Sequence, residues 1–418
     1  MKKSFPVMRA HCLRNSIVGI SLLSLLIVFI QNQNLMAQTE LSVNDFVFDG
    51  PLGSEGATIE KIDKNHFKVS LGHAPEHTDW ANMIQFQIKR NAKGNALRLD
   101  VFHYGGSNYR FNDYFYSYSY DGKNWKPIQW LYKEKDSSKG DILYFPEFEE
   151  DRVFVGHQVP LSYEDITELI KKWEQHPHVK VNVLGQSLGG RNIYRLEITD
   201  PQSPYPANTR WSHYITNQHP GEHNAQWRIA GMIDWLLSDE GADCRKRSVC
   251  HFIPIMSPDA PSHGWYRVNA QGVDGNRSYF GGGADKEKQA HEAYICQKDL
   301  EMLMASNTPV TNVWSMHTWQ GIVEPLIMPG PEVGNKIGPW TEFDEIITKN
   351  DPYNLIKPLK ADKDEDPRYW NTGPHMQFGI TTFLCEGAGT IYTKEANVHS
   401  GEILMKSLAE YYRGVKNK

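Results

Sequence analysis

Apolar and polar residues alternate along the first part of the chain, from Leu41 to about Phe154. The alternation is clear in the stretches FKVSL, MIQFQIKR, ALRLDVFHY and YFYSYSYDG, and it places alternate side chains on opposite faces of a strand. Turn-forming Gly, Asn and Asp residues separate the stretches, as in AKGN, GGSN and DGKN. We therefore predict an antiparallel β-sandwich of about a hundred residues.

The periodicity changes to that of helices after this region. In residues 162–176 the apolar positions lie on one helical face, and Ser162 is a suitable N-cap with Asp165 at the third helical position. Residues 225–239 repeat the helical pattern, and residues 400–418 have the pattern of a closing helix.

Short apolar runs lie between these helices: HYIT, VCHFIPIM, TNVWSM and GITTFLC. Buried strands that alternate with helices are typical of an α/β domain with a parallel or mixed sheet. We predict a mixed sheet with helices on both faces over residues 155–418, preceded by the β-sandwich at residues 38–154.

The first 37 residues have the pattern of a secretory signal peptide. Basic residues precede the apolar run SIVGISLLSLLIVFI, and LMA at residues 35–37 suits a cleavage site. The run is about fifteen residues long, shorter than the roughly 20 that a spanning helix needs, so we favour cleavage over a membrane anchor. We expect a secreted or periplasmic protein without membrane association after cleavage.

Charge and cysteine content add two expectations. The net charge is −6, from 44 basic and 50 acidic residues, and without a basic stripe no nucleic-acid partner is expected. Export would allow disulfides, and Cys244 and Cys250 are close enough in sequence to form one. The alternative is that all the cysteines beyond the signal are buried thiols.

Polar side chains follow several of the predicted strands. In open α/β sheets ligands bind beyond the carboxyl ends of the strands, so we expect these side chains to meet at one edge of the sheet. They are His219, Glu222, Arg267, Asp274, Asn276, Arg277, His317 and Glu386.

Two imidazoles and a carboxylate are a common ligand set for catalytic zinc, with a fourth position left for water. His219, Glu222 and His317 fit this set, and we predict that they bind Zn²⁺. The segment HPGEH also matches H-x-x-E-H, in which both histidines bind metal from one helix. A Pro-Gly pair is unfavourable inside a helix, so we interpret Glu222 as a ligand and His223 as a flanking residue.

The segment GQSLG, with Ser187 at its centre, matches the G-x-S-x-G motif of serine hydrolases. That motif requires a strand before the serine and a helix after it. Here GRNIYRLEIT follows and alternates like a second strand, which favours a hairpin turn.

Taken together, the motifs resemble those of the M14 zinc carboxypeptidases. The segments LGQSLGGRNIYRLEI, HPGEHNAQW, GVDGNRSYF, SMHTWQG and TTFLCEGAG occur in the order of that family. The resemblance covers residues 155–412, and the β-rich region before it is similar to the N-terminal domain of the cytosolic-carboxypeptidase-like subgroup.

The resemblance implies a role for each residue around the metal. His219, Glu222 and His317 correspond to the zinc ligands of the family. Glu386 corresponds to the general base that activates water, and Arg267 to the arginine that polarises the scissile carbonyl. A carboxylate within reach of an activated water can take and return its proton, which makes the role of Glu386 chemically sensible.

The remaining roles concern the substrate. Asn276 and Arg277 resemble the pair that binds the terminal carboxylate, for which the guanidinium is a bidentate partner. Asp274 resembles the carboxylate that orients the first histidine. Tyr369 is a candidate for the mobile tyrosine of the family, by its position before Glu386.

Two positions depart from the family pattern, and substrate preference is open. Ser257 stands where Asn is usual, and Gly275 stands where a larger residue is usual. Arg368 and His375 are polar candidates for a specificity residue. If Arg368 faces the pocket, an acidic terminal residue would be favoured.

These patterns predict a secreted zinc metallocarboxypeptidase that hydrolyses the C-terminal bond of peptides with a free carboxylate. The sequence does not distinguish this function from that of a cell-wall peptide (murein) amidase with the same mechanism. Two alternatives belong to other classes, a serine hydrolase that uses Ser187 and a non-catalytic glycan-binding protein.

Overall fold

The computed structural model describes residues 39–102, 115–128, 141–327, 340–353, 355–358, 366–391 and 393–414. The predicted signal peptide at residues 1–37 lies outside them. Leu41–Lys418 forms one compact unit. None of the helices in the described part combines the length and apolar character that a bilayer crossing requires.

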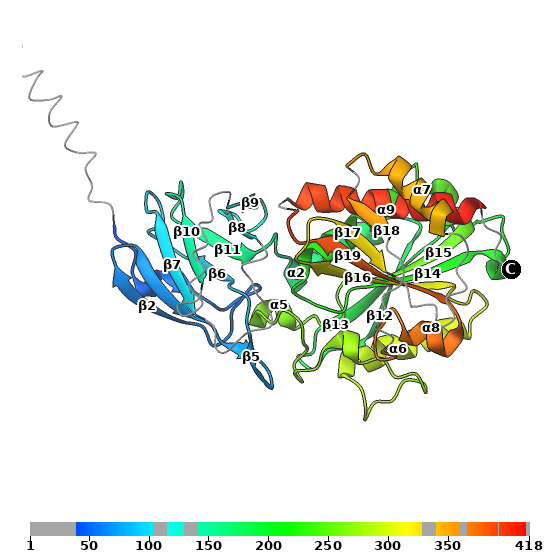
Figure 1. Ribbon diagram of the computed structural model, residues 1–418, viewed down its shortest axis with the longest axis horizontal. Helices are drawn as coiled ribbons and strands as arrows, with labels where there is room; N and C mark the ends of the chain where they lie inside the picture. The colour runs from blue at the N-terminus through cyan, green and yellow to red at the C-terminus, as the bar shows by residue number, and fades with distance from the viewer. Residues whose placement is uncertain are drawn as a thin grey trace, which may run out of the picture. The chain divides into compact units, whose positions relative to one another are not determined.

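Two β-sheets come from residues 46–157 (Figure 1). The first contains, in spatial order, β1 (Phe46–Val47), β6 (Phe86–Ile88), β11 (Val153–His157), β8 (Tyr116–Ser119) and β9 (Lys126–Pro127). The second contains β10 (Asp141–Phe145), β7 (Leu97–Phe102), β3 (His66–Ser70) and β2 (Thr58–Asp63). A separate hairpin of β4 (His73–Ala74) and β5 (His77–Ala81) follows β3, and a short helix η1 (Val43–Asp45) precedes β1.

The two sheets share one hydrophobic core, as the alternation predicted. Phe67 and Val69 of β3 pack in the same cluster as Phe86 and Ile88 of β6. Among the described strands of this part the pairings are antiparallel, except that β3 and β7 run parallel. Alternation reports which face of a strand is buried, but it carries no information on strand direction.

The second part contains a mixed sheet, as predicted, and the described residues contribute eight strands to it. In spatial order they are β12 (Val179–Gln186), β13 (Asn192–Ile198), β15 (Ser248–Ile253), β14 (Trp211–Thr216), β16 (Asn312–Trp319), β19 (Thr381–Ala388), β17 (Glu324–Ile327) and β18 (Ile356–Pro358). The central strands β15, β14, β16 and β19 are parallel to one another, and the pairs β12–β13, β13–β15 and β17–β19 are antiparallel.

Helices cover both faces of this sheet, which confirms the predicted fold class (Figure 1). One face packs against α2 (Tyr163–Glu174), α3 (His223–Leu237), α7 (Trp340–Asn350) and α9 (Lys394–Gly414). The other packs against α6 (His291–Met304) and α8 (Gly373–Phe378). The short helices α4 (Ala242–Arg247), α5 (Ala260–His263), η3 (Ala207–Thr209) and η4 (Gly275–Arg277) lie in the connections.

Adjacent residues of one central strand face these two helical layers in turn. Ile215 of β14 packs with α3 and α9, whereas its neighbour Tyr214 packs with α6. Both side chains are fully buried. Burial on both faces explains why these strands are continuous apolar runs and not alternating ones.

The four cysteines of the described part are buried free thiols. Cys244 and Cys250 do not form the disulfide considered above, and both sulfur atoms lie near Ser248 Oγ, at 3.3 and 3.5 Å. The alternative of buried thiols is therefore the correct one.

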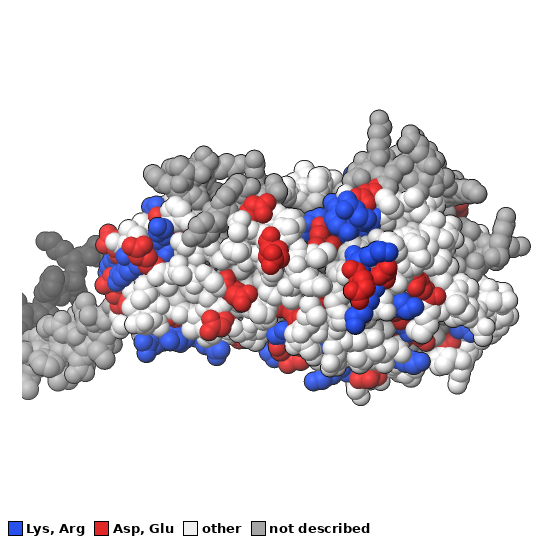
Figure 2. Space-filling model, turned by 90° about the horizontal axis from the view of Figure 1, so that it is seen from below, with Lys and Arg blue, Asp and Glu red and all other residues white. Residues whose placement is uncertain are grey.

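Acidic and basic side chains are interspersed on the face shown in Figure 2. Neither sign dominates a large area of the described surface in this view. This distribution agrees with the small net charge of −6.

The predicted cap of α2 is present. Ser162 Oγ accepts a hydrogen bond from Asp165 N at 3.0 Å, and Ser162 N donates to Asp165 Oδ2 at the same distance. Together they satisfy backbone donors that the first helical turn leaves without partners.

We expect Ser162→Ala to lower the free energy of unfolding by about 1 kcal/mol, because it removes the capping acceptor. Chemical denaturation measures the change. Glu168→Ala is the control, since Glu168 is exposed in the same helix and should alter stability by less than about 0.5 kcal/mol. Equal effects of the two substitutions would contradict the capping role.

Candidate active site

The loop between β14 and α3 carries the first two metal-ligand candidates. After Thr216 the chain leaves the sheet, and α3 begins only at His223, so Pro220 and Gly221 lie outside the helix as expected. A Cβ atom on Gly221 would lie 2.7 Å from Tyr266 Cα and 2.8 Å from Met83 Sδ. Only glycine fits this close approach, which holds the loop in one path.

The third candidate comes from the neighbouring strand. His317 lies within β16, which extends to Trp319. The strand is therefore longer at its carboxyl end than the apolar run TNVWSM from which it was predicted. Parallel pairing of β14 and β16 places this strand beside the loop that follows Thr216. Residues almost a hundred positions apart therefore meet at the predicted edge of the sheet.

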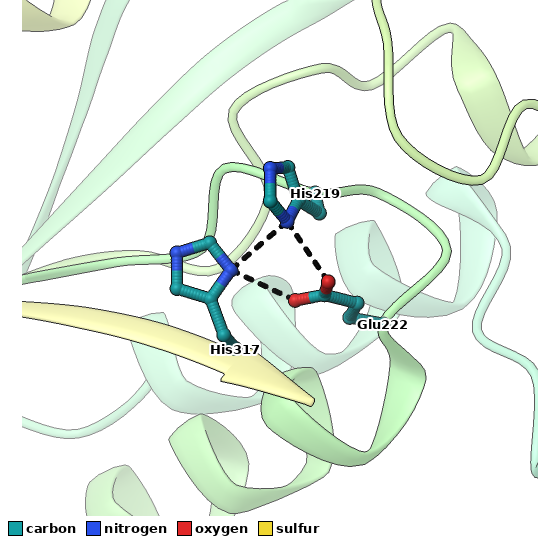
Figure 3. Close-up of side chains that lie close together, drawn as sticks. All are labelled: His219, Glu222 and His317. Atoms are coloured by element: carbon teal, nitrogen blue, oxygen red, sulfur yellow. Dashed lines mark hydrogen bonds and ion pairs between the residues drawn. The ribbon is translucent and has the colours of Figure 1, made fainter. Parts of the chain in front are cut away.

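His219, Glu222 and His317 converge on a common point (Figure 3). His219 Nδ1 lies 2.8 Å from Glu222 Oε1, His317 Nδ1 lies 2.9 Å from Glu222 Oε2, and the two Nδ1 atoms are 3.0 Å apart. All three side chains are buried.

The opposite nitrogen of each imidazole is held by the surrounding structure. His219 Nε2 lies 2.9 Å from Asp274 Oδ1, and His317 Nε2 lies 2.9 Å from Ser315 Oγ. Ser315 Oγ in turn donates to Gln218 Oε1 at 2.8 Å. Such contacts fix the orientation of a histidine ring, and they leave both Nδ1 atoms facing the common point.

The protonation equilibria of Glu222 and His317 suit metal binding. The Glu222 and Asp274 carboxylates outweigh burial and raise the pKa of His219, so this imidazole must release its proton when a metal binds. Burial alone would raise the pKa of Glu222, but the two neighbouring imidazoles outweigh it and lower that pKa strongly. Burial lowers the pKa of His317 to about 4. An ionised carboxylate and a neutral imidazole are the forms that bind a divalent cation. This donor set is one that zinc commonly uses, so the residues fit the predicted metal.

Asp274 connects the candidate metal site to the loop before η4. Its Oδ1 accepts from Asn276 N at 2.8 Å and faces His219, while its Oδ2 accepts from Arg267 Nε at 2.6 Å. The carboxylate is buried, and the charges of His219 and Arg267 overcome the effect of burial and lower its pKa. One ionised side chain thus contacts two other side chains and one backbone amide.

Glu386 lies in β19 directly opposite His317 in the parallel register. Its Oε2 is buried and makes no hydrogen bond with the described residues. Burial and the negative charge of Glu222 raise the pKa of Glu386 to about 8. A buried carboxylate with an unused acceptor atom beside a candidate metal site is suited to proton transfer.

These groups line one cavity of about 320 Å³. Asn276 and Arg277 lie on its wall, with Asn276 Oδ1 held by Trp370 N at 2.9 Å. The Arg277 guanidinium lies 3.7 Å from the centre of the Tyr369 ring. Of the predicted site residues only Asp274 is absent from the described lining, and it contacts the site through His219 and Arg267.

Arg368 and His375 do not line the cavity, so neither holds the position expected of a specificity residue. Arg368 pairs with Asp366, Nη2 to Oδ2 at 2.6 Å, and the arginine side chain is exposed. His375 Nδ1 lies 2.7 Å from the Ile380 carbonyl oxygen. Asn371, which lies between them in the sequence, does line the cavity.

Further lining residues were not identified from the sequence. They are Tyr266, Thr318, Trp319, Gln320, Ile327, Asn371 and Leu384. Leu384 lies two positions before Glu386 on the same strand, so the twofold period of a strand could have indicated it. Ile327 belongs to the antiparallel strand β17, whose place beside β19 no local pattern reveals.

Ser187 lies in the turn between β12 and β13, as the alternating segment after it predicted. Its Oγ donates to Asp259 Oδ1 at 2.8 Å and accepts from Arg191 N at 3.0 Å. The serine is buried, and it is not among the cavity residues. These contacts describe a structural turn.

Comparison with known proteins identifies the domain. The family model Peptidase_M14, described as zinc carboxypeptidase, matches residues 166–313. The chain carries a zinc carboxypeptidase domain of the Peptidase_M14 family. The matched residues include His219 and Glu222 but end before His317 and Glu386.

Similar proteins extend this match. "Cytosolic carboxypeptidase 2" of Xenopus tropicalis is 28% identical over 247 residues, which are 52% of this chain and 25% of the relative. The chain thus spans about a quarter of that relative's length.

Solved structures agree with the fold of this zinc carboxypeptidase domain and of the sheets before it. A metallo-carboxypeptidase from Burkholderia cenocepacia has a TM-score of 0.73 at 18% identity and covers 88% of this chain and 99% of its own. The Pseudomonas aeruginosa metallo-carboxypeptidase in complex with (2-guanidinoethylmercapto)succinic acid has a TM-score of 0.72 at 18% identity, with coverage of 88% and 99%. At this identity the similarity shows the fold.

Curated relatives that are named cytosolic carboxypeptidases contradict the prediction of a secreted or periplasmic protein. That prediction was wrong by this comparison. It rested on the basic residues, the apolar run and the LMA site within residues 1–37, and such a local pattern does not by itself distinguish an export signal from other apolar segments.

We expect Asp274→Asn to weaken metal affinity by about 10- to 100-fold, because the neutral amide orients His219 less firmly and releases Arg267. Titration against a chelator of known affinity measures the change. Asp285→Asn, an Asp-to-Asn substitution away from the cavity, is the control and should leave the affinity unchanged. An unaltered affinity in Asp274→Asn would show that this carboxylate does not support the site.

Proposed function

We propose that this chain is a zinc metallocarboxypeptidase that hydrolyses the C-terminal peptide bond of peptides with a free carboxylate. The observation that supports it best is the meeting, in one cavity, of a buried two-histidine, one-glutamate set with Glu386 and with Asn276 and Arg277. This combination provides a metal site, a proton-transfer group and a carboxylate-binding pair.

His219, Glu222 and His317 would hold the zinc ion through two Nδ1 atoms and the Glu222 carboxylate. A zinc ion bound there supplies Lewis-acid activation of water and stabilises negative charge on oxygen. Asp274 and Ser315 keep both imidazoles in the orientation that this ligation needs.

Glu386 would move the proton. Its carboxylate takes a proton from the attacking water, whose oxygen forms a bond to the scissile carbonyl carbon. The protonated carboxyl then gives the proton to the leaving amine as the C–N bond breaks. Arg267 would face the carbonyl oxygen and stabilise the charge that develops there, which is the kind of interaction that contributes most to such reactions.

Asn276 and Arg277 would bind the terminal carboxylate. A guanidinium forms paired hydrogen bonds with a carboxylate, and this contact requires a free C-terminus. Stacking on Tyr369 keeps the guanidinium against one wall of the cavity. This binding mode accounts for removal of a terminal residue instead of cleavage within a chain.

The side-chain pocket favours a neutral terminal residue. The described lining residues that have no role in the chemistry proposed above carry no charge; they are Tyr266, Thr318, Trp319, Gln320, Ile327, Asn371 and Leu384. Arg368, the cation that would have favoured an acidic residue, is paired with Asp366 outside the cavity.

The division of the chain at residues 154 and 155 belongs to this proposal. The change from two β-sheets to the mixed sheet supports a sandwich part followed by a catalytic part, and β11 (Val153–His157) of the sandwich continues three residues past the proposed boundary between residues 38–154 and 155–418. The reaction groups named above all come from the second part.

We expect the purified protein to contain one zinc ion per chain, as measured by mass spectrometry. The variant His219→Ala should lose that zinc ion. His223→Gln is the matched control, because His223 lies in the same HPGEH segment outside the convergent set and should leave the zinc in place. Wild-type protein without stoichiometric metal would contradict the proposal.

Glu386→Gln separates binding from chemistry. It should retain the zinc and lower kcat by at least about a thousandfold on blocked dipeptides with free C-termini, because the amide cannot accept the proton. Amidated dipeptides serve as the substrate control and should not be cleaved. Cleavage of muropeptides in the same panel would indicate a murein amidase. A serine-directed phosphonate should leave the activity unchanged, because Ser187 is not expected to react.

Leu384→Arg should raise kcat/KM for a terminal Glu relative to a terminal Leu by at least about tenfold, because it adds a cation to the pocket wall. Competition between the two blocked dipeptides measures the ratio. Arg368→Ala should leave this ratio unchanged. This assignment of the pocket would be overturned if the ratio changed in Arg368→Ala and stayed the same in Leu384→Arg.

A further inference from the structure

The β4–β5 hairpin of the N-terminal part contacts the loop that precedes η4. His77 Nε2, in β5, donates a hydrogen bond to the Gly272 carbonyl oxygen at 2.6 Å, although the two residues are 195 positions apart. The His77 ring also stacks on Trp80, with the ring centres 3.7 Å apart and the planes inclined by 10°. The imidazole is thus held in the orientation that reaches Gly272.

Gly272 allows the two backbones to touch. Its φ angle is +71°, and a Cβ atom at this position would lie 2.3 Å from the Pro75 carbonyl oxygen. Both the conformation and the close approach require glycine. The turn at Gly272 is closed by Gly272 N donating to Asn269 O at 3.0 Å, and Val268 forms a bridge with Asp274.

A small hydrophobic cluster joins the same two segments. Ala74 and Trp80 come from the hairpin, and they pack with Trp265 and Val268 of the loop and with Ala260 of α5. This cluster is distinct from the sandwich core and from the cores of the mixed sheet. Its members have no part in the reaction proposed above.

The loop that receives these contacts carries two groups of the candidate site. Arg267 lies five positions before Gly272, and Asp274 lies two positions after it. Asp274 Oδ1 is 2.9 Å from His219 Nε2. A contiguous path therefore runs from His77 through Gly272 and Asp274 to the metal-ligand candidate His219.

We propose that the β4–β5 hairpin is a positioning element for the catalytic loop, with His77 as its positioning residue. Loops that carry reaction groups are mobile unless they are supported, and a displacement of about 1 Å can cost up to about a hundredfold in rate. The hairpin supplies that support from outside the mixed sheet. The expected loss of rate rests on the proposed function. The expected support of the loop rests on the geometry alone.

The kinetic test compares His77→Ala with Thr78→Ala in the zinc-loaded, full-length protein. Thr78 is the exposed neighbour of His77 on β5. We expect kcat to fall about tenfold in His77→Ala with a smaller rise in KM, because the loop carries Arg267 and Asp274, and Asp274 also holds the Asn276 backbone beside the terminal carboxylate. His77→Gln retains a donor and should recover most of the rate.

A double-mutant cycle tests whether the effect passes through Asp274. In the Asp274→Asn background, His77→Ala should cost less than about twofold further, because the link that it disturbs is already lost. A role in general stability predicts instead that the two losses multiply and that the melting temperatures fall in proportion. If His77→Ala does not fold, His77→Leu, which packs on Trp80 but cannot donate, carries the same expectations.

Amide hydrogen exchange gives a readout that needs no turnover. Exchange across residues 265–274 should be faster in His77→Ala than in wild type and unchanged in Thr78→Ala. An inactive wild type with this exchange pattern would refute the proposed function and leave the positioning role standing. Unchanged exchange, a kcat within twofold of wild type or losses that multiply in the cycle would overturn the positioning role.

Discussion

The structure depends on the parallel pairing of β14, β16 and β19. This pairing sets His317 opposite Glu386 and places both beside the loop that begins after Thr216. Because strands in a buried parallel sheet are held by packing on both faces, their carboxyl ends form a rigid edge. The candidate metal ligands, the proton-transfer candidate and the wall at Leu384 all take their positions from that edge.

The groups at the edge are buried and charged, so their desolvation must be compensated. Asp274 provides much of the compensation by contacting His219, Arg267 and the Asn276 backbone at once. Glu222 is satisfied in the same way by two imidazoles and by Thr318 N at 2.9 Å. Glu386 is different, because its Oε2 makes no hydrogen bond with the described residues. Unmet hydrogen-bonding capacity in a buried carboxylate is costly, and it is found where a group must exchange protons.

Support for this edge comes from outside the mixed sheet as well. Tyr266 packs in the core of the N-terminal sandwich while it lines the cavity, and Met83 of the sandwich part lies against Gly221 in the candidate metal loop. The N-terminal sheets are therefore in contact with both loops that carry reaction groups. This gives the sandwich a physical connection to the site that composition and alternation did not indicate.

The sequence by itself determined the kinds of element and the chemical groups. Periodicity identified α2 with its Ser162 cap, the hairpin around Ser187 and the apolar central strands, since these depend on local burial and local hydrogen bonds. The HPGEH segment indicated a loop because proline and glycine disfavour a helical turn there. Only the tertiary structure decided which strands are neighbours and that β3 and β7 run parallel. It also decided that Ile327 and Leu384 line the cavity, whereas Arg368 pairs with Asp366. The hydrogen bond from His77 to Gly272 is likewise visible only in the folded chain. These are contacts between segments far apart in the chain, and they follow from the packing of the whole molecule, which no local pattern records.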